Sequence, residues 1–546
     1  MADGPGPPPS SAAPGRSAGV PTPPVREGVA RSASVVAAAT LGSRLLGLAR
    51  EAVFAALFGT RWFADAFVFA FRIPNLLRDF FAEGALASAF VPTFTEVATH
   101  DGPERAFALA RRTMGTLLAV TGLLALLGIV FAPAVVAVVA WDVPAEVRPL
   151  VVRLTRIMFP FLPLVALAAV AMGILNARSR YFVPALAPMF FNVVAVLGGL
   201  GLLAAGLPME EAVTAWAVLV LVGGAVQFAV QVPLLRSLGW RGRPELDLRL
   251  RDPALRQIVR RMGPIVRSVA ATNLMVLLTT ALASQQRGWA SSLNFAFRLV
   301  HLPIGLIGVA LGTVVLSAGA RHAAAADPEG LEDLGRRALR LNGFLALPAA
   351  VGLAVLAEPL VRLLYERGAF TVASTQEVAE ALRAYAFGVV GYAGVKASAP
   401  VFLARGDTRT PVRCSLLGLA VNAGTALALV GPLGHRGLAW AVALGATTNY
   451  LALRLSALRQ HGRGSFPGVP FLLRVGAASA LLAAAGTWIV APWLLGDAAP
   501  HGGLRGALVT LGAVGLLAGL YLGACVLLGL EEVGHLGRWW RRRRTP

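Results

Sequence analysis

The sequence predicts an all-α polytopic membrane protein: fourteen transmembrane helices, built as two parallel six-helix lobes around a central cavity plus two extra C-terminal helices. Three features lead to this class: the composition, the distribution of arginine and an internal repeat. The chain has 546 residues, of which 56% are hydrophobic and 14% are charged, whereas soluble domains carry about 25% charged residues. Apolar stretches of the ~20 residues that cross a bilayer recur along nearly the whole chain.

The first element is a polar tail. Residues 1–32 are dominated by Pro, Gly, Ser and Ala and contain no apolar run, so we expect a disordered cytoplasmic tail and not a signal peptide. Fourteen expected spans follow it. They lie near residues 33–58, 64–97, 106–140, 149–177, 182–206, 211–236, 256–285, 290–320, 334–357, 376–404, 410–431, 436–460, 470–495 and 504–530.

Arginines between the spans support this order. If the N-terminus lies inside, the inner loops hold most of them. These are Arg105, Arg111, Arg112, Arg178, Arg180, Arg236, Arg241, Arg243, Arg249, Arg251, Arg321, Arg336, Arg337, Arg405, Arg409, Arg413, Arg459, Arg463 and Arg541 to Arg544. The outer loops hold only Arg61, Arg148, Arg287, Arg367, Arg436 and Arg505. This bias predicts that both termini are cytoplasmic. It also accounts for the formal net charge of +21, so we expect no nucleic acid partner.

A repeat divides the spans into two halves. The sequence Phe-Ala-Phe-Arg at 69–72 recurs at 295–298, and Ala-Arg at 177–178 recurs at 404–405. The two copies lie 226 and 227 residues apart, a distance that corresponds to six spans. Because six is even, the halves have the same orientation in the membrane. We therefore expect an N-lobe at 33–236, a C-lobe at 256–462, and spans 13 and 14 at 470–530 outside the repeat.

Two basic segments complete the division. The segment 237–255 is polar and basic and connects the lobes; either it is a plain linker or it lies on the membrane surface. Residues 531–546 form a basic cytoplasmic tail.

Arginines also lie inside apolar spans. Arg44 and Arg50 are in the first span, and Arg298 is in the eighth. An arginine at the centre of a spanning helix costs roughly 2.5–3.5 kcal/mol on insertion scales, and such residues persist where they face a wet cavity or bind an anion. Guanidinium groups match phosphate oxygens, so an anionic, phosphate-bearing cargo is indicated. For Arg44 and Arg50, the alternative is snorkelling or pairing with Glu51 or Asp65.

The second span is unusually polar. Its candidate site residues, together with Ser43 beside Arg44, are Asp65, Asn75, Arg78 and Glu83. Asp65 and Glu83 either hold arginines in place when the cavity is empty or only neutralise charge locally. Pro74 is expected to let the helix bend. The sequence contains no phosphate-binding glycine loop of the GKS/T type and no cluster with metal-ligand spacing, so we expect neither ATP hydrolysis nor another enzymatic activity, and no metal.

The same residues carry a family resemblance. The matching stretches are Ser43-Arg44-Leu-Leu-Gly47-Leu-Ala-Arg50, Asp65-Ala-Phe, Arg72-Ile-Pro-Asn-Leu-Leu-Arg78, Ala82-Glu83-Gly84, Phe90-Val-Pro92, the run from Pro303 to Thr313, Glu366-Arg-Gly-Ala-Phe-Thr371 and Gly406-Asp-Thr-Arg-Thr-Pro411. With these motifs, residues 33–460 resemble the MurJ (MviN) lipid II flippases of the multidrug/oligosaccharidyl-lipid/polysaccharide exporter superfamily.

The resemblance implies a flippase that moves lipid II, the undecaprenyl-diphosphate-linked peptidoglycan precursor, across the bacterial inner membrane by alternating access for cell wall synthesis. It implies that Arg44, Arg50 and Arg298 line the cavity, that Asp65 and Arg78 are functionally important, and that spans 13 and 14 form a groove for the lipid tail. We also consider membrane lipids and the cell-wall synthesis machinery as partners.

The chain departs from the family in its second half. Family members often carry an acid near position 277 and a polar residue at 426, where this chain has Leu277 and Ala426. These positions are associated with sodium, so a sodium site is doubtful here; coupling to another ion or to the membrane potential stays open. Phe297 replaces a frequent Asp beside Arg298, which removes the neighbour expected to balance that arginine.

Rival functions differ in what the cavity must hold. A flippase for another polyprenyl-diphosphate glycan would use the same arginines. A drug exporter of the same superfamily would need acids for cationic drugs. An intramembrane glycosyltransferase would need a catalytic acid at a water-facing cleft, and no large loop exists to build one.

Overall fold

A computed structural model describes residues 26–82, 85–462, 467–496 and 503–534. Within these ranges every regular element is helical, which confirms the predicted class. Ten helices or continuous helical runs are long and apolar enough to cross a membrane. Helices also occupy the other four expected segments, which carry α1, α2 with α3, α11 and α19. The count of fourteen spans therefore stays a prediction.

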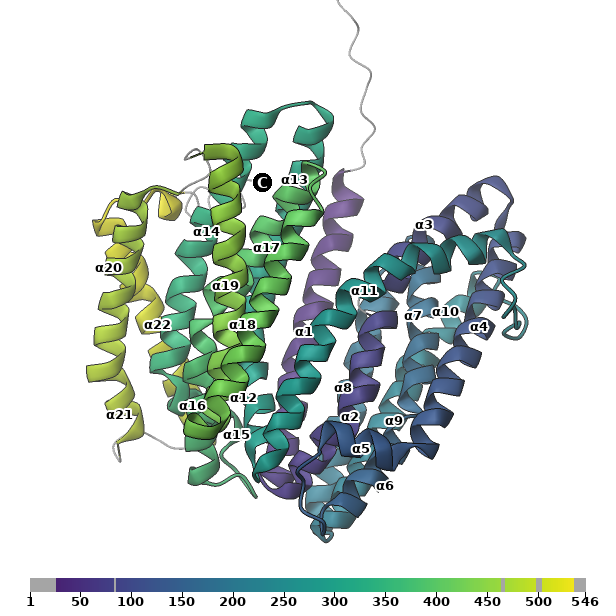
Figure 1. Ribbon diagram of the computed structural model, residues 1–546, viewed down its shortest axis with the longest axis horizontal. Helices are drawn as coiled ribbons and strands as arrows, with labels where there is room; N and C mark the ends of the chain where they lie inside the picture. The colour runs from purple at the N-terminus through teal and green to yellow at the C-terminus, as the bar shows by residue number, and fades with distance from the viewer. Residues whose placement is uncertain (1–25, 83–84, 463–466, 497–502, 535–546) are drawn as a thin grey trace, which may run out of the picture.

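The first ten helices pack mainly on one another (Figure 1). They are α1 (Arg26–Phe58), α2 (Trp62–Ala82), α3 (Ala85–His100), α4 (Pro103–Val130), α5 (Ala132–Val139), α6 (Arg148–Met158), α7 (Phe161–Ala177), α8 (Phe182–Ala205), α9 (Met209–Ala229) and α10 (Val232–Ser237). We call them the first bundle. Pro74 lies inside α2 without ending it. The neighbour contacts of α1 are chiefly with α8, and those of α4 with α7.

A second bundle is formed by the helices after α11 (Pro253–Leu282) and the short η1 (Ala283–Gln285). Its helices are α12 (Trp289–Pro303), the π-helical turn η2 (Ile304–Gly308), α13 (Val309–Ala324), α14 (Pro328–Val355), α15 (Ala357–Tyr365), α16 (Val372–Phe387), α17 (Val389–Ala404), α18 (Arg409–Leu433) and α19 (His435–His461). Helix α18 begins at a tight turn, where Asp407 Oδ1 accepts hydrogen bonds from the amides of Arg409 and Thr410. That turn therefore has a structural role at the start of α18.

The last helices lie on the outer side of the second bundle (Figure 1). They are α20 (Val469–Ala485), η4 (Gly486–Val490), α21 (Ala491–Leu495) and α22 (Gly503–Leu527). Helices α20 and α22 pack on α14. The hydroxyl of Tyr521 donates to the carbonyl of Phe344 over 2.7 Å, and Arg340 pairs with Glu532 over 2.5 Å just beyond the end of α22. The C-terminal helices are therefore attached to the body at two levels.

Helix α11 joins the two bundles. It packs on α2, α3, α4 and α5 of the first bundle and on α18 of the second, and in Figure 1 it runs obliquely between them. The bundles come together at the end of the molecule opposite the start of α1 (Figure 1). Residues of both bundles form one continuous buried cluster.

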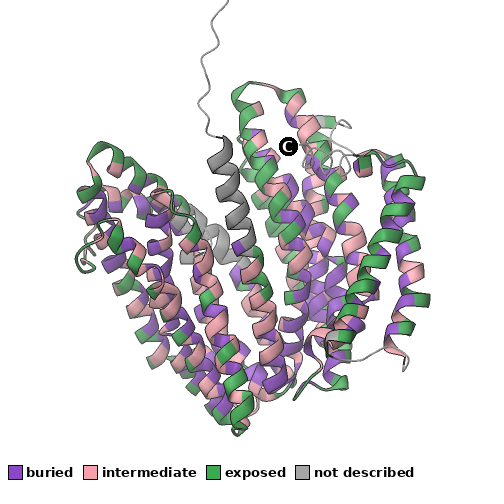
Figure 2. Ribbon diagram, turned by 180° about the vertical axis from the view of Figure 1, so that it is seen from behind, coloured by how far each residue is buried: buried purple, intermediate pink, exposed green. Residues whose placement is uncertain are grey.

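The outward faces of the helices are apolar. Large side chains such as Leu197, Leu473, Leu516 and Leu527 are exposed by 64–89%, and Figure 2 shows exposed positions along the outer sides of both bundles and buried ones within them. Exposed leucines on adjacent helices would be unfavourable in water but suit hydrocarbon. This arrangement agrees with a multi-pass membrane protein.

The linker between the bundles is held to α4 by buried charge. Asp252 caps α11 by accepting from the amide of Ala254 at 3.0 Å, and the same carboxylate accepts hydrogen bonds from Arg105 at 2.8 and 3.0 Å and from Arg112 at 2.7 Å. Burial alone would raise the pKa of Asp252, but the hydrogen bonds from the two arginines outweigh it and lower that pKa to about 2. The start of α11 is thus fixed to the first bundle.

Asp252→Asn should lower the free energy of unfolding by about 2 kcal/mol at pH 7, because the charge-assisted bonds and part of the cap are lost. A carboxyl whose folded-state pKa is depressed stabilises the fold above its ordinary pKa, near 3.8, and loses that contribution as the pH falls toward 2. The difference between wild type and variant in thermal unfolding should therefore narrow below pH 4. Asp101→Asn, at an exposed position, is the matched control, and an equal effect there would contradict the assignment.

Candidate functional site

A small pocket lies between the two bundles. Its lining residues come from α1, α2, α8, α9 and α12, and they are Arg50, Glu51, Phe54, Phe67, Val68, Phe71, Arg72, Asn75, Phe191, Trp216, Val220, Asn294 and Arg298. The space accessible to water is about 50 Å³, room for roughly three or four water molecules. The pocket therefore combines an aromatic wall with charged groups from both halves of the chain.

One carboxylate balances two arginines in this pocket. Glu51 Oε1 lies 2.6 Å from Arg50 Nη2 and 3.3 Å from Arg298 Nε. The Glu51 side chain is 8% exposed and that of Arg298 is 46% exposed. Arg50 also lies over the ring of Phe191, 5.4 Å from its centroid, which adds a cation–π contact. Arg298 of the second bundle is thus balanced by an acid from the first.

Two further predicted residues lie on α2 near this pair. Asn75 lines the pocket, and Arg78, one turn further along, is half-buried and acts electrostatically on Arg50. Arg72, which ends the first copy of the repeat, and Asn294 also line the pocket. The carbonyl of Leu76 is fixed by a hydrogen bond of 3.1 Å from the side chain of Asn273 in α11.

Arg44 and Ser43 lie outside this enclosed pocket. The guanidinium of Arg44 reaches the second bundle at the π-helical turn η2, where a Cβ built on Gly305 would lie 2.7 Å from its Nη1. A side chain at position 305 would displace the flexible end of Arg44 from this place. The carbonyl of Ser43 accepts a hydrogen bond of 3.2 Å from Asn192 of α8. Arg44 therefore contacts both bundles on the side of Arg50 toward the start of α1.

Among the residues that the structure describes, Asp65 pairs with no arginine, which corrects one of the two roles considered for it. Its carboxylate is fully buried and accepts hydrogen bonds from the backbone amides of Gly288 at 2.6 Å and Ser291 at 2.8 Å. These are free amides at the first turn of α12. Asp65 therefore caps a helix of the opposite bundle, a role that needs a carboxylate near a helix start and not a cation.

Other contacts close the same end of the molecule. The Thr60 and Ser374 hydroxyls are 2.8 Å apart, and the amide of Ala369 donates to the carbonyl of Ala56 over 2.8 Å. Gly59 and Gly368 have φ of +57° and +60°, and a Cβ on either would lie 2.4 Å from a carbonyl oxygen of the other segment. The turns after α1 and α15 thus interlock through their backbones.

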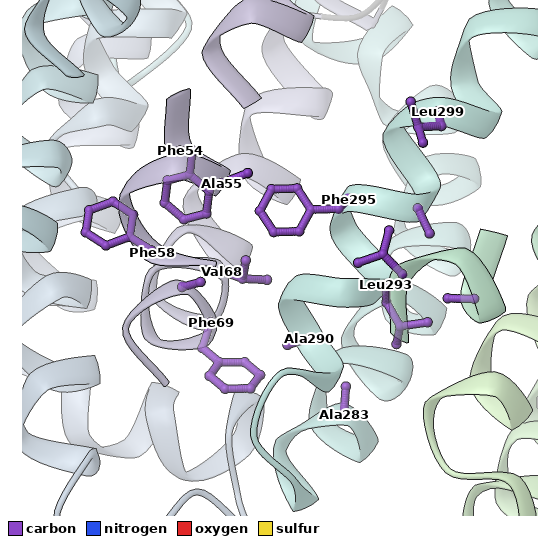
Figure 3. Close-up of a cluster of buried hydrophobic side chains, with 14 of the residues drawn as sticks. Phe54, Ala55, Phe58, Val68, Phe69, Ala283, Ala290, Leu293, Phe295 and Leu299 are labelled. Atoms are coloured by element: carbon purple, nitrogen blue, oxygen red, sulfur yellow. The ribbon is translucent and has the colours of Figure 1, made fainter. Parts of the chain in front are cut away.

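An aromatic cluster lies beside these contacts. Phe54 of α1 faces Phe295 of α12 (Figure 3), with their ring centroids 6.0 Å apart. Phe58 of α1 and Phe69 of α2 belong to the same buried cluster. Phe69 and Phe295 are equivalent positions of the sequence repeat, and both are buried. The repeat therefore supplies apolar anchors on both sides of the interface.

Glu83, the last of the predicted site residues, lies outside the described residues. Phe297 packs 4.3 Å from the ring of His301 and 5.4 Å from that of Tyr385, so it fills an aromatic cluster of the second bundle instead of accompanying Arg298.

The sequence analysis underestimated Glu51 and did not include Asn294 or Gly305 of the eighth span among the candidate site residues. Glu51 was considered only as a partner for the first-span arginines. Its contact with Arg298 follows from the packing of α1 against α12, which sequence spacing does not show. The available signal was the imbalance itself: Arg298 lacks an acid on its own span, so its partner had to come from another.

Comparison with known proteins decides the family. Residues 54–497 match the family described as "Lipid II flippase MurJ". This chain belongs to the MurJ family. The resemblance drawn from its motifs is confirmed.

Curated MurJ relatives cover nearly the whole chain. The lipid II flippase MurJ of Burkholderia cenocepacia is 37% identical over 440 residues, which are 79% of this chain and 84% of the relative. The probable lipid II flippase MurJ of Rhizobium meliloti is 35% identical over 527 residues, 93% of this chain and 96% of the relative.

Solved structures agree with the MurJ fold. A structure described as "Lipid II flippase MurJ, inward closed conformation" superposes with a TM-score of 0.74 at 22% identity, covering 90% of this chain and 98% of that one. An inward-facing multidrug resistance transporter of the MATE family, in the MOP superfamily, gives a TM-score of 0.63 at 16% identity, covering 79% and 99%. At these identities the likeness concerns the fold.

The shared carboxylate predicts a coupling that a double-mutant cycle can measure. Glu51→Gln should lower the free energy of unfolding by about 2 kcal/mol, because it leaves two guanidiniums together without their acid. Arg298→Gln in the same chain should recover part of that loss, giving a coupling energy of about 1 kcal/mol. Thermal unfolding of the four proteins in detergent gives the values. Strictly additive effects, or an equal loss in the exposed control Glu96→Gln, would contradict the pairing.

Proposed function

We propose that this chain is a lipid II flippase of the bacterial inner membrane, carrying the undecaprenyl-diphosphate-linked precursor of peptidoglycan from the inner to the outer leaflet. The observation that carries the proposal is the pocket between the bundles, where Arg50 and Arg298 converge on one carboxylate. Membership of the MurJ family and the names of the curated relatives support the cargo. The protein is a transporter and not an enzyme: it moves its cargo without changing it covalently.

The charge balance of the pocket suits a diphosphate. Glu51 compensates the two arginines while the pocket holds only water. A diphosphate presents several anionic oxygens and can take over both guanidiniums, because their planar forks bind phosphate in pairs of hydrogen bonds. The cargo then crosses the apolar core with its charge paired, while its lipid tail stays in hydrocarbon. The outer surface of α20 and α22 is our candidate path for that tail.

The closed end of the molecule supports alternating access. Asp65, Thr60 and the interlocked turns at Gly59 and Gly368 lie next to the loops expected on the outer side. The bias of arginine toward the inner loops supports this orientation, with both termini in the cytoplasm. In our proposal the described state is closed to the outside, and transport requires these contacts to break while the bundles rock about the pocket.

The membrane potential is the proposed energy source. Outward movement of a negative headgroup is favoured by an inside-negative potential, by about 2.3 kcal/mol per charge for each 100 mV. The side chains of Leu277 and Ala426 provide no oxygen ligand for sodium, so the proposal includes no sodium coupling.

Rival functions fit the pocket less well. A cationic drug would meet three arginines in the pocket and a single acid that already pairs with two of them. A flippase for another polyprenyl-diphosphate glycan would share the arginine chemistry, and only competition between purified cargoes separates it from the present proposal.

Arg298→Ala and Arg44→Ala should each reduce lipid II flipping at least tenfold, because each removes charge-assisted bonds to the cargo, worth roughly 1.5–3 kcal/mol. Flipping is measured in proteoliposomes as the amount of lipid II that becomes accessible to a protease or a dye. The assay is run with and without an inside-negative potential, and with sodium replaced by choline. Arg287→Ala, an outer-loop arginine, is the control. Normal flipping by both cavity variants would refute the assignment, and preferential flipping of an O-antigen-type carrier would replace lipid II as cargo.

Asp65→Ala should open the outer end, because α12 loses the cap that the first bundle provides. The reporter is Thr60→Cys in a chain whose two native cysteines are replaced by alanine. Labelling of this cysteine by a membrane-impermeant maleimide from outside should rise several-fold with Asp65→Ala. It should stay low with Asp142→Ala, an exposed acid on the same side. Unchanged labelling in the Asp65 variant would show that its cap does not control closure.

A further inference from the structure

A second pocket lies far from the arginine pair, where α4, α9 and α10 meet the start of the linker between the bundles. Its volume is about 660 Å³, within the range of pockets that hold a small ligand. Its apolar floor consists of Met114, Phe228, Val232 and Leu235. Trp240 lies beside this floor, with its ring edge-on to that of Phe107 at 6.2 Å.

Two arginines, Arg236 and Arg241, also line this pocket. Both side chains are exposed, and neither forms an ion pair or side-chain hydrogen bond with any residue that the structure describes. Both also come from the chain segment that closes the pocket, so they lie close together in sequence and in space.

The neighbouring arginines, in contrast, form ion pairs with the nearby acids. Arg111 pairs with Glu245 at 2.6 Å, and Arg112 lies 2.7 Å from Asp252, which also binds Arg105. No acid lines the pocket. The pocket is therefore a local excess of positive charge over an apolar floor, next to a set of fully paired charges.

The surroundings place this pocket at the level of the inner membrane surface. The segment that closes it belongs to an arginine-rich inner loop, and Trp240 is the residue type favoured at the headgroup level. A few residues further along, Leu246 and Leu248 alternate with polar residues in the loop, and they are 64% and 58% exposed. Exposed leucines among arginines suit a segment that lies on the membrane, which favours the second of the two expectations for the linker.

We propose that this pocket binds the headgroup phosphate of an anionic phospholipid of the inner leaflet. Arg236 and Arg241 contact the phosphate, Trp240 packs along the glycerol region, and the acyl chains pass over the apolar floor toward the bilayer. Charge and an apolar floor together select a lipid over free phosphate, which would leave the floor uncovered. The site is separate from the cargo pocket and does not depend on which cargo is carried.

The test compares two pairs of arginine substitutions with the same change in charge. One variant carries Arg236→Gln and Arg241→Gln. The matched control carries Arg243→Gln and Arg249→Gln, which are exposed arginines of the same linker outside the pocket. Native mass spectrometry of the full-length protein in detergent measures phosphatidylglycerol binding over a titration, with phosphatidylcholine and inorganic phosphate as separate probes. Thermal unfolding verifies that both variants are folded.

We expect the pocket variant to bind phosphatidylglycerol roughly 30-fold more weakly, about fivefold for each arginine, and the control variant to bind it like wild type. Wild type should prefer phosphatidylglycerol to phosphatidylcholine. Equal loss in both variants would reduce the effect to general surface charge and overturn the proposal. So would unchanged binding in the pocket variant, equal affinity for phosphatidylcholine, or displacement of the lipid by millimolar inorganic phosphate.

Discussion

The central constraint on this molecule is the position of a single carboxylate. Glu51 is nearly buried and lies within ion-pair distance of Arg50 on its own helix and Arg298 on the other bundle. Removing charges from water is costly unless they are paired, so these arginines can lie between apolar bundles only because that acid is present. Beside this ion pair, the rings of Phe54 and Phe295 bring α1 and α12 into contact.

The class and much of the order of the helices follow from the sequence, because long apolar runs and the placement of arginine are determined by the membrane itself. The repeat at Phe69 and Phe295 also located two anchors of the interface. Other features depended on contacts between distant helices. Asp65 is equally compatible with an ion pair and a helix cap when only its neighbours are known, and only the approach of α12 decides between them. The balance of Arg298 by Glu51 required the same information.

Different kinds of contact hold the two bundles together at the two ends of the pocket. Toward the start of α1, the contact is a long, exposed guanidinium over Gly305, which can move without disturbing the backbone. At the opposite end, hydrogen bonds join backbone to backbone and side chain to backbone, and two glycines allow the turns to interlock. Flexible side chains on one side and fixed main-chain contacts on the other give the molecule a mobile end and a firmly closed one. The linker, in turn, is fixed to the first bundle at Asp252.

The cap that Asp65 provides has a consequence for reversibility. A helix cap contributes about 1 kcal/mol, far less than a disulfide or a metal site. Its donors belong to the main chain, so water can replace the carboxylate as soon as the bundles separate. Each of these contacts is weak alone, and the closure depends on several of them acting together. In the proposed transport cycle, such a closure can form and break once in every turnover.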